Sequence, residues 1–173
     1  LDDETGSYIE ELGGMNLFFV YQDGSVATPG LDGTILRGIT RDSIIQLLTD
    51  RGIKVEQRKI SLAEVEAGVA SGDITEIFAC GTAAVITPVG QLKSRKGVIG
   101  SDSVEPGKLT VSLREQLTAI QYGRLEDRHG WMHKLSILVV LLRIVFSLFP
   151  SLFFGWYFHH WNAKQVIYCL CHT

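Results

Sequence analysis

The sequence predicts a mixed α/β fold, of the α+β kind, followed by an apolar tail that is expected to be helical. Over residues 1–134, apolar runs of strand length alternate with segments in which apolar residues recur at helical spacing. All 19 acidic residues lie at or before Asp127, whereas residues 135–158 are mostly apolar. We therefore divide the chain into an acidic domain, 1–134, and an apolar tail, 135–173.

The first hairpin is predicted near the start of the domain. Residues 15–21, MNLFFVY, are apolar and aromatic, and Asp23-Gly24 follows them as a tight turn. Val26 begins the return strand, and we expect residues 28–30, Thr-Pro-Gly, to end it.

A helix is predicted over residues 41–51, because Ile44, Leu47 and Leu48 fall on one helical face. Thr40 stands where an N-cap residue is expected, and Gly52 stands where a helix usually ends. Residues 53–60 then begin with the alternation of a half-buried strand.

The capping-box pattern from Ser61 to Glu64 predicts a second helix that runs to about Ala70. Residues 74–79 and 84–89 follow as strands, and Pro88 places the second of them at a sheet edge.

A final helix is indicated by apolar residues at helical spacing and by a glycine after them. The residues are Leu109, Leu113, Leu117, Ile120 and Gly123.

Composition narrows the possible functions. The net charge of −3 and the pI near 5.9 argue against a nucleic-acid binder with a broad basic surface. Three cysteines, Cys80, Cys169 and Cys171, cannot form a disulfide framework. No signal peptide is visible, and the first residue, Leu1, indicates a truncated start.

Two small-residue turns could bind an anion. Residues 38–40, Gly-Ile-Thr, precede the first helix, where free N–H groups meet the positive end of the helix dipole. Residues 81–83, Gly-Thr-Ala, lie between two strands and could present successive N–H groups. Taken singly, each is more often an ordinary cap or turn.

Other polar residues allow weaker hypotheses. Glu10-Glu11 precede a strongly apolar strand and could orient a cofactor nitrogen, although a solvated charge pair is the commoner arrangement. Cys80 is interpreted as a small buried residue. No metal site is predicted, because the tail residues that could ligate one match no zinc spacing: His159, His160, Cys169, Cys171 and His172.

Several motifs in one order resemble the branched-chain amino acid aminotransferases, which are fold-type IV pyridoxal-phosphate enzymes. The motifs are EELGGMNLFFV (10–20), TPGLDGTILRGITRDSI (28–44), EIFACGTAAVITPV (76–89), LTAIQYG (117–123) and HGWM (129–132). The resemblance implies that residues 1–134 are the C-terminal domain of that fold, without the N-terminal domain. The tail resembles nothing in the family.

The resemblance assigns roles around a bound pyridoxal 5′-phosphate. Glu11 corresponds to the carboxylate that pairs with the pyridine nitrogen and so keeps the ring an electron sink. Leu36 corresponds to a residue packed against the ring. Arg37 departs from the proline that is common there in the family.

The resemblance also assigns residues that contact the cofactor phosphate and the substrate. Ile39 and Thr40 correspond to backbone donors for the phosphate, and Thr82 to a second phosphate contact through its hydroxyl. Thr82 and Ala83 correspond to donors for the substrate carboxylate. We therefore expect the two turns to lie close together beside Glu11.

The catalytic residue of the family has no counterpart here. The Schiff-base lysine lies upstream of the Glu11 position in the family, and no lysine of this chain matches its motif: Lys54, Lys59, Lys93, Lys96, Lys108, Lys134 and Lys164. The chain alone is thus expected to be inactive.

The implied activity is transamination of leucine, isoleucine or valine with 2-oxoglutarate, in a cytoplasmic homodimer or higher oligomer that binds no nucleic acid. Two related enzymes, D-amino acid aminotransferase and aminodeoxychorismate lyase, remain alternatives. A third is a non-enzymatic membrane-associated fragment, since residues 135–158 are long enough to cross a bilayer. We favour translated non-coding or misjoined sequence for residues 135–173.

Overall fold

The computed structural model describes residues 1–2, 5–31, 34–94, 97–100 and 105–133. The chain divides into two compact units, Leu1–Tyr122 and Gly123–Thr173. The expected helical tail and its boundary at residue 134 lie outside the described residues and stay predictions. Within the described part, no helix has the length and apolar character that crossing a membrane requires.

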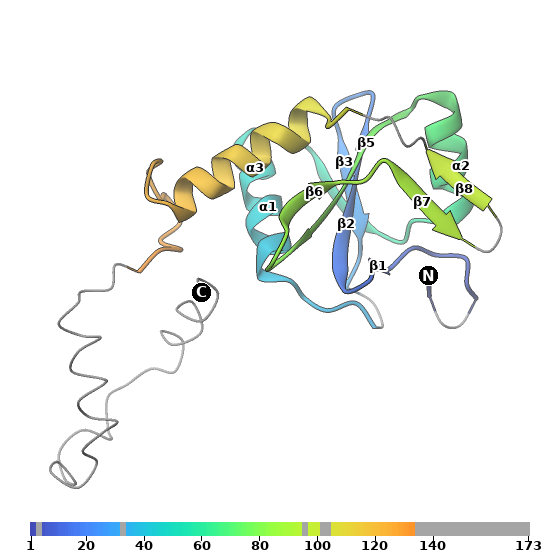
Figure 1. Cartoon of the computed structure of the whole chain (residues 1–173), viewed down its shortest axis with the longest axis horizontal. Coiled ribbons are helices and arrows are strands. Elements are labelled where there is room, and N and C mark those ends of the chain that lie inside the picture. The colour runs from blue at the N-terminus through green and yellow to red at the C-terminus, as the bar shows by residue number, and fades with distance from the viewer. Residues whose placement is uncertain (3–4, 32–33, 95–96, 101–104, 134–173) are drawn as a thin grey trace, which may run out of the picture. The chain divides into compact units, whose positions relative to one another are not determined.

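The first unit is built on a six-stranded sheet, shown in Figure 1. The strand order is β4-β3-β2-β5-β6, and β1 pairs with β2. Only β3 and β4 pair in parallel. The strands are β1 (Glu11–Leu12), β2 (Met15–Tyr21), β3 (Val26–Pro29), β4 (Val55–Arg58), β5 (Ile74–Gly81) and β6 (Val85–Pro88).

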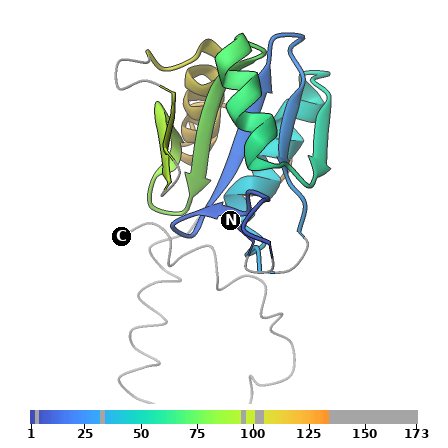
Figure 2. The same cartoon turned by 90° about the vertical axis from the view of Figure 1, so that its right-hand side faces the viewer.

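Three helices and a separate hairpin complete the described part of this unit. The helices are α1 (Ile39–Asp50), α2 (Leu62–Ser71) and α3 (Lys108–Gln121), and the hairpin pairs β7 (Gln91–Ser94) with β8 (Gly97–Gly100). Figures 1 and 2 show α1 and α3 on one face of the sheet and α2 on the other. The mixed α/β prediction is therefore confirmed.

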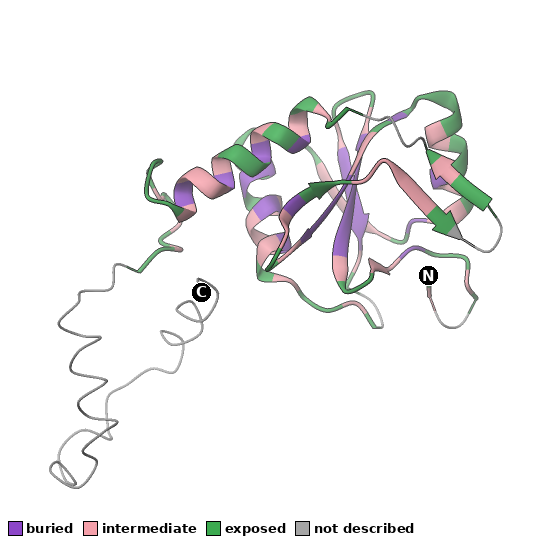
Figure 3. Ribbon diagram, viewed as in Figure 1, coloured by how far each residue is buried: buried purple, intermediate pink, exposed green. Residues whose placement is uncertain are grey.

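Strand β2 lies at the centre of the core, and its five middle residues are buried, as Figure 3 shows. Leu17 and Phe19 pack in one cluster with Val65 of α2. The alternation of a strand turns Phe18 to the opposite face, where its ring stacks on Phe78 with centroids 4.9 Å apart. A strand covered on both faces explains why MNLFFVY reads as one apolar run.

The strand prediction for residues 15–21 is confirmed to the residue, and the turn at Gly24 is confirmed with φ of 83°. The predicted end of the return strand is confirmed, because β3 ends at Pro29, within residues 28–30. There it pairs with Arg58 of β4, and Gly30 donates to the Arg58 carbonyl across 3.1 Å. A parallel partner distant in sequence thus pairs with the strand as far as its proline.

The later elements largely follow the predictions. Ser61 caps α2 by accepting a hydrogen bond from the Glu64 N–H at 3.1 Å, and β6 lies at the sheet edge as Pro88 indicated. The β7–β8 hairpin was not predicted, because its strands are only four residues long and lack alternation.

In the second unit, the described residues near the HGWM motif form a tight turn around Asp127. Its carboxylate accepts hydrogen bonds from the N–H groups of His129 at 3.3 Å and Met132 at 2.6 Å. The rings of His129 and Trp131 stack with centroids 4.6 Å apart. Burial raises the pKa of Asp127, but the surrounding backbone N–H groups outweigh it and lower the pKa overall.

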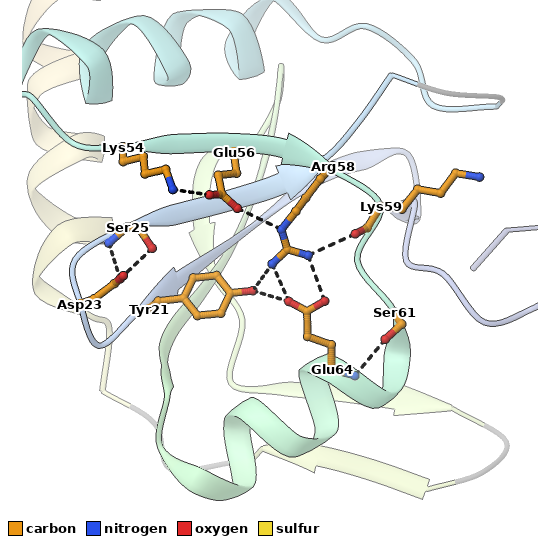
Figure 4. A network of polar contacts seen from close by, with 9 residues as sticks. All are labelled: Tyr21, Asp23, Ser25, Lys54, Glu56, Arg58, Lys59, Ser61 and Glu64. Atoms are coloured by element: carbon orange, nitrogen blue, oxygen red, sulfur yellow. Dashed lines mark hydrogen bonds and ion pairs between the residues drawn. The ribbon is translucent and has the colours of Figure 1, made fainter.

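A polar network ties α2 to the sheet, as Figure 4 shows. Arg58 of β4 donates to both carboxylate oxygens of Glu64, at 2.6 and 3.0 Å, and to the Tyr21 hydroxyl at 3.1 Å. Tyr21 in turn donates to Glu64 at 2.8 Å. The capping box is therefore half formed, because Glu64 turns to Arg58 rather than back to the backbone N–H of Ser61.

The network shifts the pKa values of Glu64 and Tyr21. Hydrogen bonding to Arg58 lowers the pKa of Glu64. Burial, together with the hydrogen bond to Glu64, raises the pKa of Tyr21 to about 12. The stabilisation of the fold by ionised Glu64 is present above the usual glutamate pKa. It is lost as the pH falls through the lowered pKa of Glu64. The stabilisation of the fold by protonated Tyr21 is lost as the pH rises from the usual tyrosine pKa of 10 toward the raised pKa of about 12.

We predict that Glu64→Gln lowers the free energy of unfolding by about 1 kcal/mol at neutral pH, since the ion pair is partly screened by solvent. Urea unfolding measures the loss. Glu66→Gln, an exposed acid on the same helix, is the control and should change little. The gap between wild type and Glu64→Gln should narrow as the pH falls, and a gap that stays constant down to acidic pH would contradict the role of the carboxylate.

Candidate anion-binding site

Several chain segments converge at one end of the sheet. The antiparallel register pairs Asn16, at the start of β2, with Cys80, near the end of β5. Strand β3 ends at the same end, where Thr28 donates to the Leu17 carbonyl at 2.7 Å. Figures 1 and 2 show the turn after β5 and the start of α1 at this lower end.

The buried side chain of Asn16 joins these segments. Its backbone pairs with Glu11 of β1 and with Cys80 of β5, and its side chain is 6% exposed. The Asn16 amide nitrogen donates to the Leu36 carbonyl at 3.2 Å. Its amide oxygen lies where a Cβ on Gly38 would overlap it. Asn16 was not among the predicted site residues, although a single amide inside an apolar strand is a visible anomaly.

The segment that leads into α1 is fixed to β1 and its neighbour. The Leu36 N–H donates to the Glu11 carboxylate at 2.7 Å, and the Thr34 hydroxyl donates to the Glu10 carboxylate at 2.7 Å. The Leu36 side chain nevertheless stays 73% exposed. Glu11 and Leu36, two of the predicted site residues, therefore lie in direct contact.

Helix α1 begins two residues earlier than predicted. Its N-cap is Gly38, in an extended conformation, and the expected cap, Thr40, lies inside the first turn. A glycine at this N-cap leaves room for the close approach of the Asn16 amide oxygen. The first helical hydrogen bond runs from the Asp42 N–H to the Gly38 carbonyl, so the N–H groups of Ile39 and Thr40 have no acceptor within the helix.

The three helices differ in how their N-termini are satisfied. Ser61 caps α2, and the Glu76 carboxylate accepts hydrogen bonds from the N–H groups of Leu109 at 3.0 Å and Thr110 at 2.9 Å in α3. Among the residues that the structure describes, no side-chain hydrogen bond caps α1. The Glu76 carboxylate thus occupies the start of α3. At the start of α1, the N–H groups of Ile39 and Thr40 meet no such carboxylate among the described residues and can bind an anion.

Thr82 and Ala83 belong to the turn that follows β5. Both are exposed, and the register of β5 brings the turn to the same end of the sheet as Asn16. Cys80 just before it is buried, as expected, and burial raises the pKa of its thiol to about 12, which makes it a poor nucleophile.

The described part of the chain holds no group of three or more His, Cys, Asp or Glu residues that could bind a metal ion. The tail residues considered for one lie outside the described ranges.

Val85 closes this turn in an unusual conformation. Its φ is 56°, in the left-handed region, while it pairs with Gly81 in the β5–β6 ladder. A β-branched residue there is strained, because its side chain crowds the backbone. The buried neighbour Ile86 and the ladder hold it in place. Strain of this kind often accompanies turns whose exact shape matters.

We predict that Val85→Gly is more stable than Val85→Ala by about 1 kcal/mol, because glycine adopts positive φ without the Cβ penalty. Both variants lose the same branched side chain, so thermal unfolding of the pair isolates the backbone effect. In an ordinary strand alanine is the more stable of the two, and that order would refute the left-handed conformation.

Comparison with known protein families gives a match over residues 3–92 to the model described as amino-transferase class IV. The branched-chain-amino-acid aminotransferase of Mycolicibacterium smegmatis is 51% identical over 139 residues, which are 79% of this chain and 38% of that protein. A probable branched-chain-amino-acid aminotransferase of Staphylococcus epidermidis is 50% identical over 131 residues, 76% of this chain and 36% of that protein. The chain thus spans less than two fifths of the length of these relatives.

Solved structures of branched-chain amino acid aminotransferases are also similar to this chain. The branched-chain amino acid aminotransferase of Escherichia coli superposes with a TM-score of 0.63 at 33% identity, over 75% of this chain and 39% of that one. The T.th. enzyme, complexed with N-(5′-phosphopyridoxyl)-L-glutamate, gives a TM-score of 0.63 at 32% identity, over 77% of this chain and 40% of that one. The family match covers more than half of the chain, and the chain therefore belongs to the class IV aminotransferase family.

Proposed function

We propose that this chain forms the pyridoxal phosphate-binding part of a branched-chain amino acid aminotransferase. The whole protein would exchange the amino group of leucine, isoleucine or valine with 2-oxoglutarate. The observation that carries the proposal is the uncapped start of α1, which Asn16 holds beside Glu11 and Leu36. Relatives with about half of their aligned residues identical bear that enzyme's name, which supports the substrate class.

The residues at the start of α1 fit the phosphate of the cofactor. The N–H groups of Ile39 and Thr40 are free of helical acceptors, and Gly38 carries no side chain that would obstruct a ligand. Buried nitrogens of Arg41 without hydrogen-bond acceptors among the described residues add positive charge beneath the turn. A dianion gains both from the N–H groups and from this charge.

The neighbouring residues fit the ring. Leu36 and Ile39 are 73% and 52% exposed, and such apolar side chains at a charged helix start offer a surface for a flat aromatic group. The Glu11 carboxylate accepts one hydrogen bond from Leu36 and retains capacity to accept another from a protonated pyridine nitrogen. Pyridoxal phosphate, when bound, supplies the electron sink that makes the α-proton of an amino acid acidic.

We assign the substrate carboxylate to the turn after β5. The N–H groups of Thr82 and Ala83 would bind it, and the Thr82 hydroxyl would add a contact to the phosphate. Val85 would hold the turn in the shape that this requires. These roles follow from the family resemblance, and the exposure of both turn residues is compatible with them.

The residue that moves the proton is proposed to lie on a part of the parent protein upstream of the Glu11 position. Two of the described lysines are engaged elsewhere: Lys54 pairs with Glu56, and Lys59 lies over the Tyr8 ring, 5.5 Å from its centroid. We further propose, from the same resemblance, that the parent enzyme is a cytoplasmic homo-oligomer.

The phosphate assignment predicts that the 173-residue chain binds pyridoxal phosphate more tightly than pyridoxal, which lacks the phosphate. Thr82→Val should weaken binding of pyridoxal phosphate about tenfold, the effect of one hydrogen bond to a charged group. Fluorescence titration measures both affinities. Thr87→Val, an exposed threonine on β6, is the matched control. Equal affinity of wild type for the two ligands would refute the site.

The missing lysine gives a second prediction. The chain alone should not transaminate leucine, because it lacks a positioned amine to form the covalent link with the cofactor and to move the proton. Borohydride reduction after incubation with pyridoxal phosphate, followed by mass spectrometry, should find no single lysine labelled stoichiometrically. Labelling of one specific lysine together with measurable turnover would overturn this account.

A further inference from the structure

Arg41 is a buried arginine in the first turn of α1. Its side chain is 1% exposed and reaches the ends of two strands. There its Nη2 donates to the Pro29 carbonyl of β3 at 2.9 Å and to the Gln57 amide oxygen of β4 at 3.0 Å. The guanidinium therefore fastens the start of α1 to the end of the sheet where the candidate site lies.

The charge of this guanidinium is incompletely compensated. Its Nε and Nη1 have no hydrogen-bond acceptor among the described residues. The carboxylate paired with it, that of Asp42, lies 3.7 Å from Nη1, and it also accepts a hydrogen bond from Arg37 at 3.2 Å. Burial lowers the pKa of Arg41, but an arginine remains protonated at neutral pH.

A cation in the first turn of a helix is electrostatically unfavourable, because the helix dipole is positive at that end. Acidic groups stand at all three helix starts: Asp42 beside Arg41 in the first turn of α1, Glu64 in the first turn of α2, and the Glu76 carboxylate at the start of α3. Asp42 offsets part of the Arg41 charge but is shared with Arg37, and an anion bound at the start of α1 would offset more of it. A phosphate monoester carries up to two negative charges at neutral pH and would supply this compensation.

We propose that Arg41 is a positioning residue for the phosphate of the ligand, through a buried charge that never touches it. Its nitrogens are covered by protein, so it acts through its field and by holding the Ile39–Thr40 turn in place. This inference rests on the proposed phosphate site and extends it to a residue to which the family resemblance gave no role.

The charge and the tether can be separated by substitution. Arg41→Lys keeps the charge and shortens the tether, whereas Arg41→Met and Arg41→Gln remove the charge. Arg41→Gln retains a neutral amide that can donate hydrogen bonds. Gln57→Ala removes one acceptor of the tether without changing any charge, and it serves as the matched control.

The experiment measures dissociation constants of the full 173-residue chain for pyridoxal phosphate, pyridoxal and inorganic phosphate. Arg41→Met and Arg41→Gln should weaken the binding of pyridoxal phosphate and of inorganic phosphate about tenfold, because a buried charge acts at short range through a low dielectric. The dissociation constant for pyridoxal should change less than about twofold, because pyridoxal carries no phosphate charge. Arg41→Lys and Gln57→Ala should stay within about threefold of wild type for all three ligands.

The outcomes discriminate between the possible failures. If wild type binds pyridoxal phosphate no better than pyridoxal, the proposed function fails. If wild type prefers the phosphate and the neutral variants keep that preference, only the role of Arg41 fails. A tenfold loss in Arg41→Lys would overturn the charge mechanism by itself, whether or not the neutral variants fold.

Discussion

The side chain of Asn16 is the contact on which the candidate site depends. It lies in β2, whose five middle residues are buried, and interacts with the segment before α1 through Leu36 and Gly38. Its backbone pairs with β1 on one side and β5 on the other. A buried amide must have its hydrogen bonds satisfied, so this geometry leaves few alternatives. The apolar core thus fixes the position of a polar residue, and that residue fixes the start of α1.

The second constraint is electrostatic. Ser61 accepts a hydrogen bond at the start of α2 and Glu76 accepts hydrogen bonds at the start of α3, but no described side chain caps α1. Arg41 adds a buried positive charge beneath the open helix start, and the exposed Leu36 and Ile39 surround it with apolar surface. An uncapped helix, a buried cation and exposed apolar side chains each carry a cost in the isolated chain, and a bound aromatic phosphate ester would offset all three.

The sequence predicted the elements whose signals are local. The buried run at 15–21, the turn at Gly24 and the cap at Ser61 depend on neighbours within a few residues, and each was confirmed. The errors arose where distant partners decide. Helix α1 starts two residues earlier than predicted, after a glycine against which Asn16 lies, and Glu64 turns to Arg58 of β4 instead of completing the capping box.

The site shows the same division between local and distant signals. Glu11 and Leu36 were named from the family resemblance and lie in contact, whereas Asn16 and Arg41 were missed. Their importance comes from burial and from partners 12 to 20 residues away, which no local pattern reveals. The left-handed Val85 was equally invisible, since the sequence there reads as an ordinary strand.

The most direct test of the account is amide chemical-shift mapping of the 173-residue chain by NMR, titrated with pyridoxal phosphate and separately with pyridoxal. The account predicts that the amides of Ile39 and Thr40, and that of Thr82, shift with the phosphorylated ligand alone. The amides of Leu109 and Thr110, which Glu76 already holds, should remain unchanged. Shifts confined to other parts of the chain, or identical shifts with both ligands, would contradict a phosphate site at the start of α1.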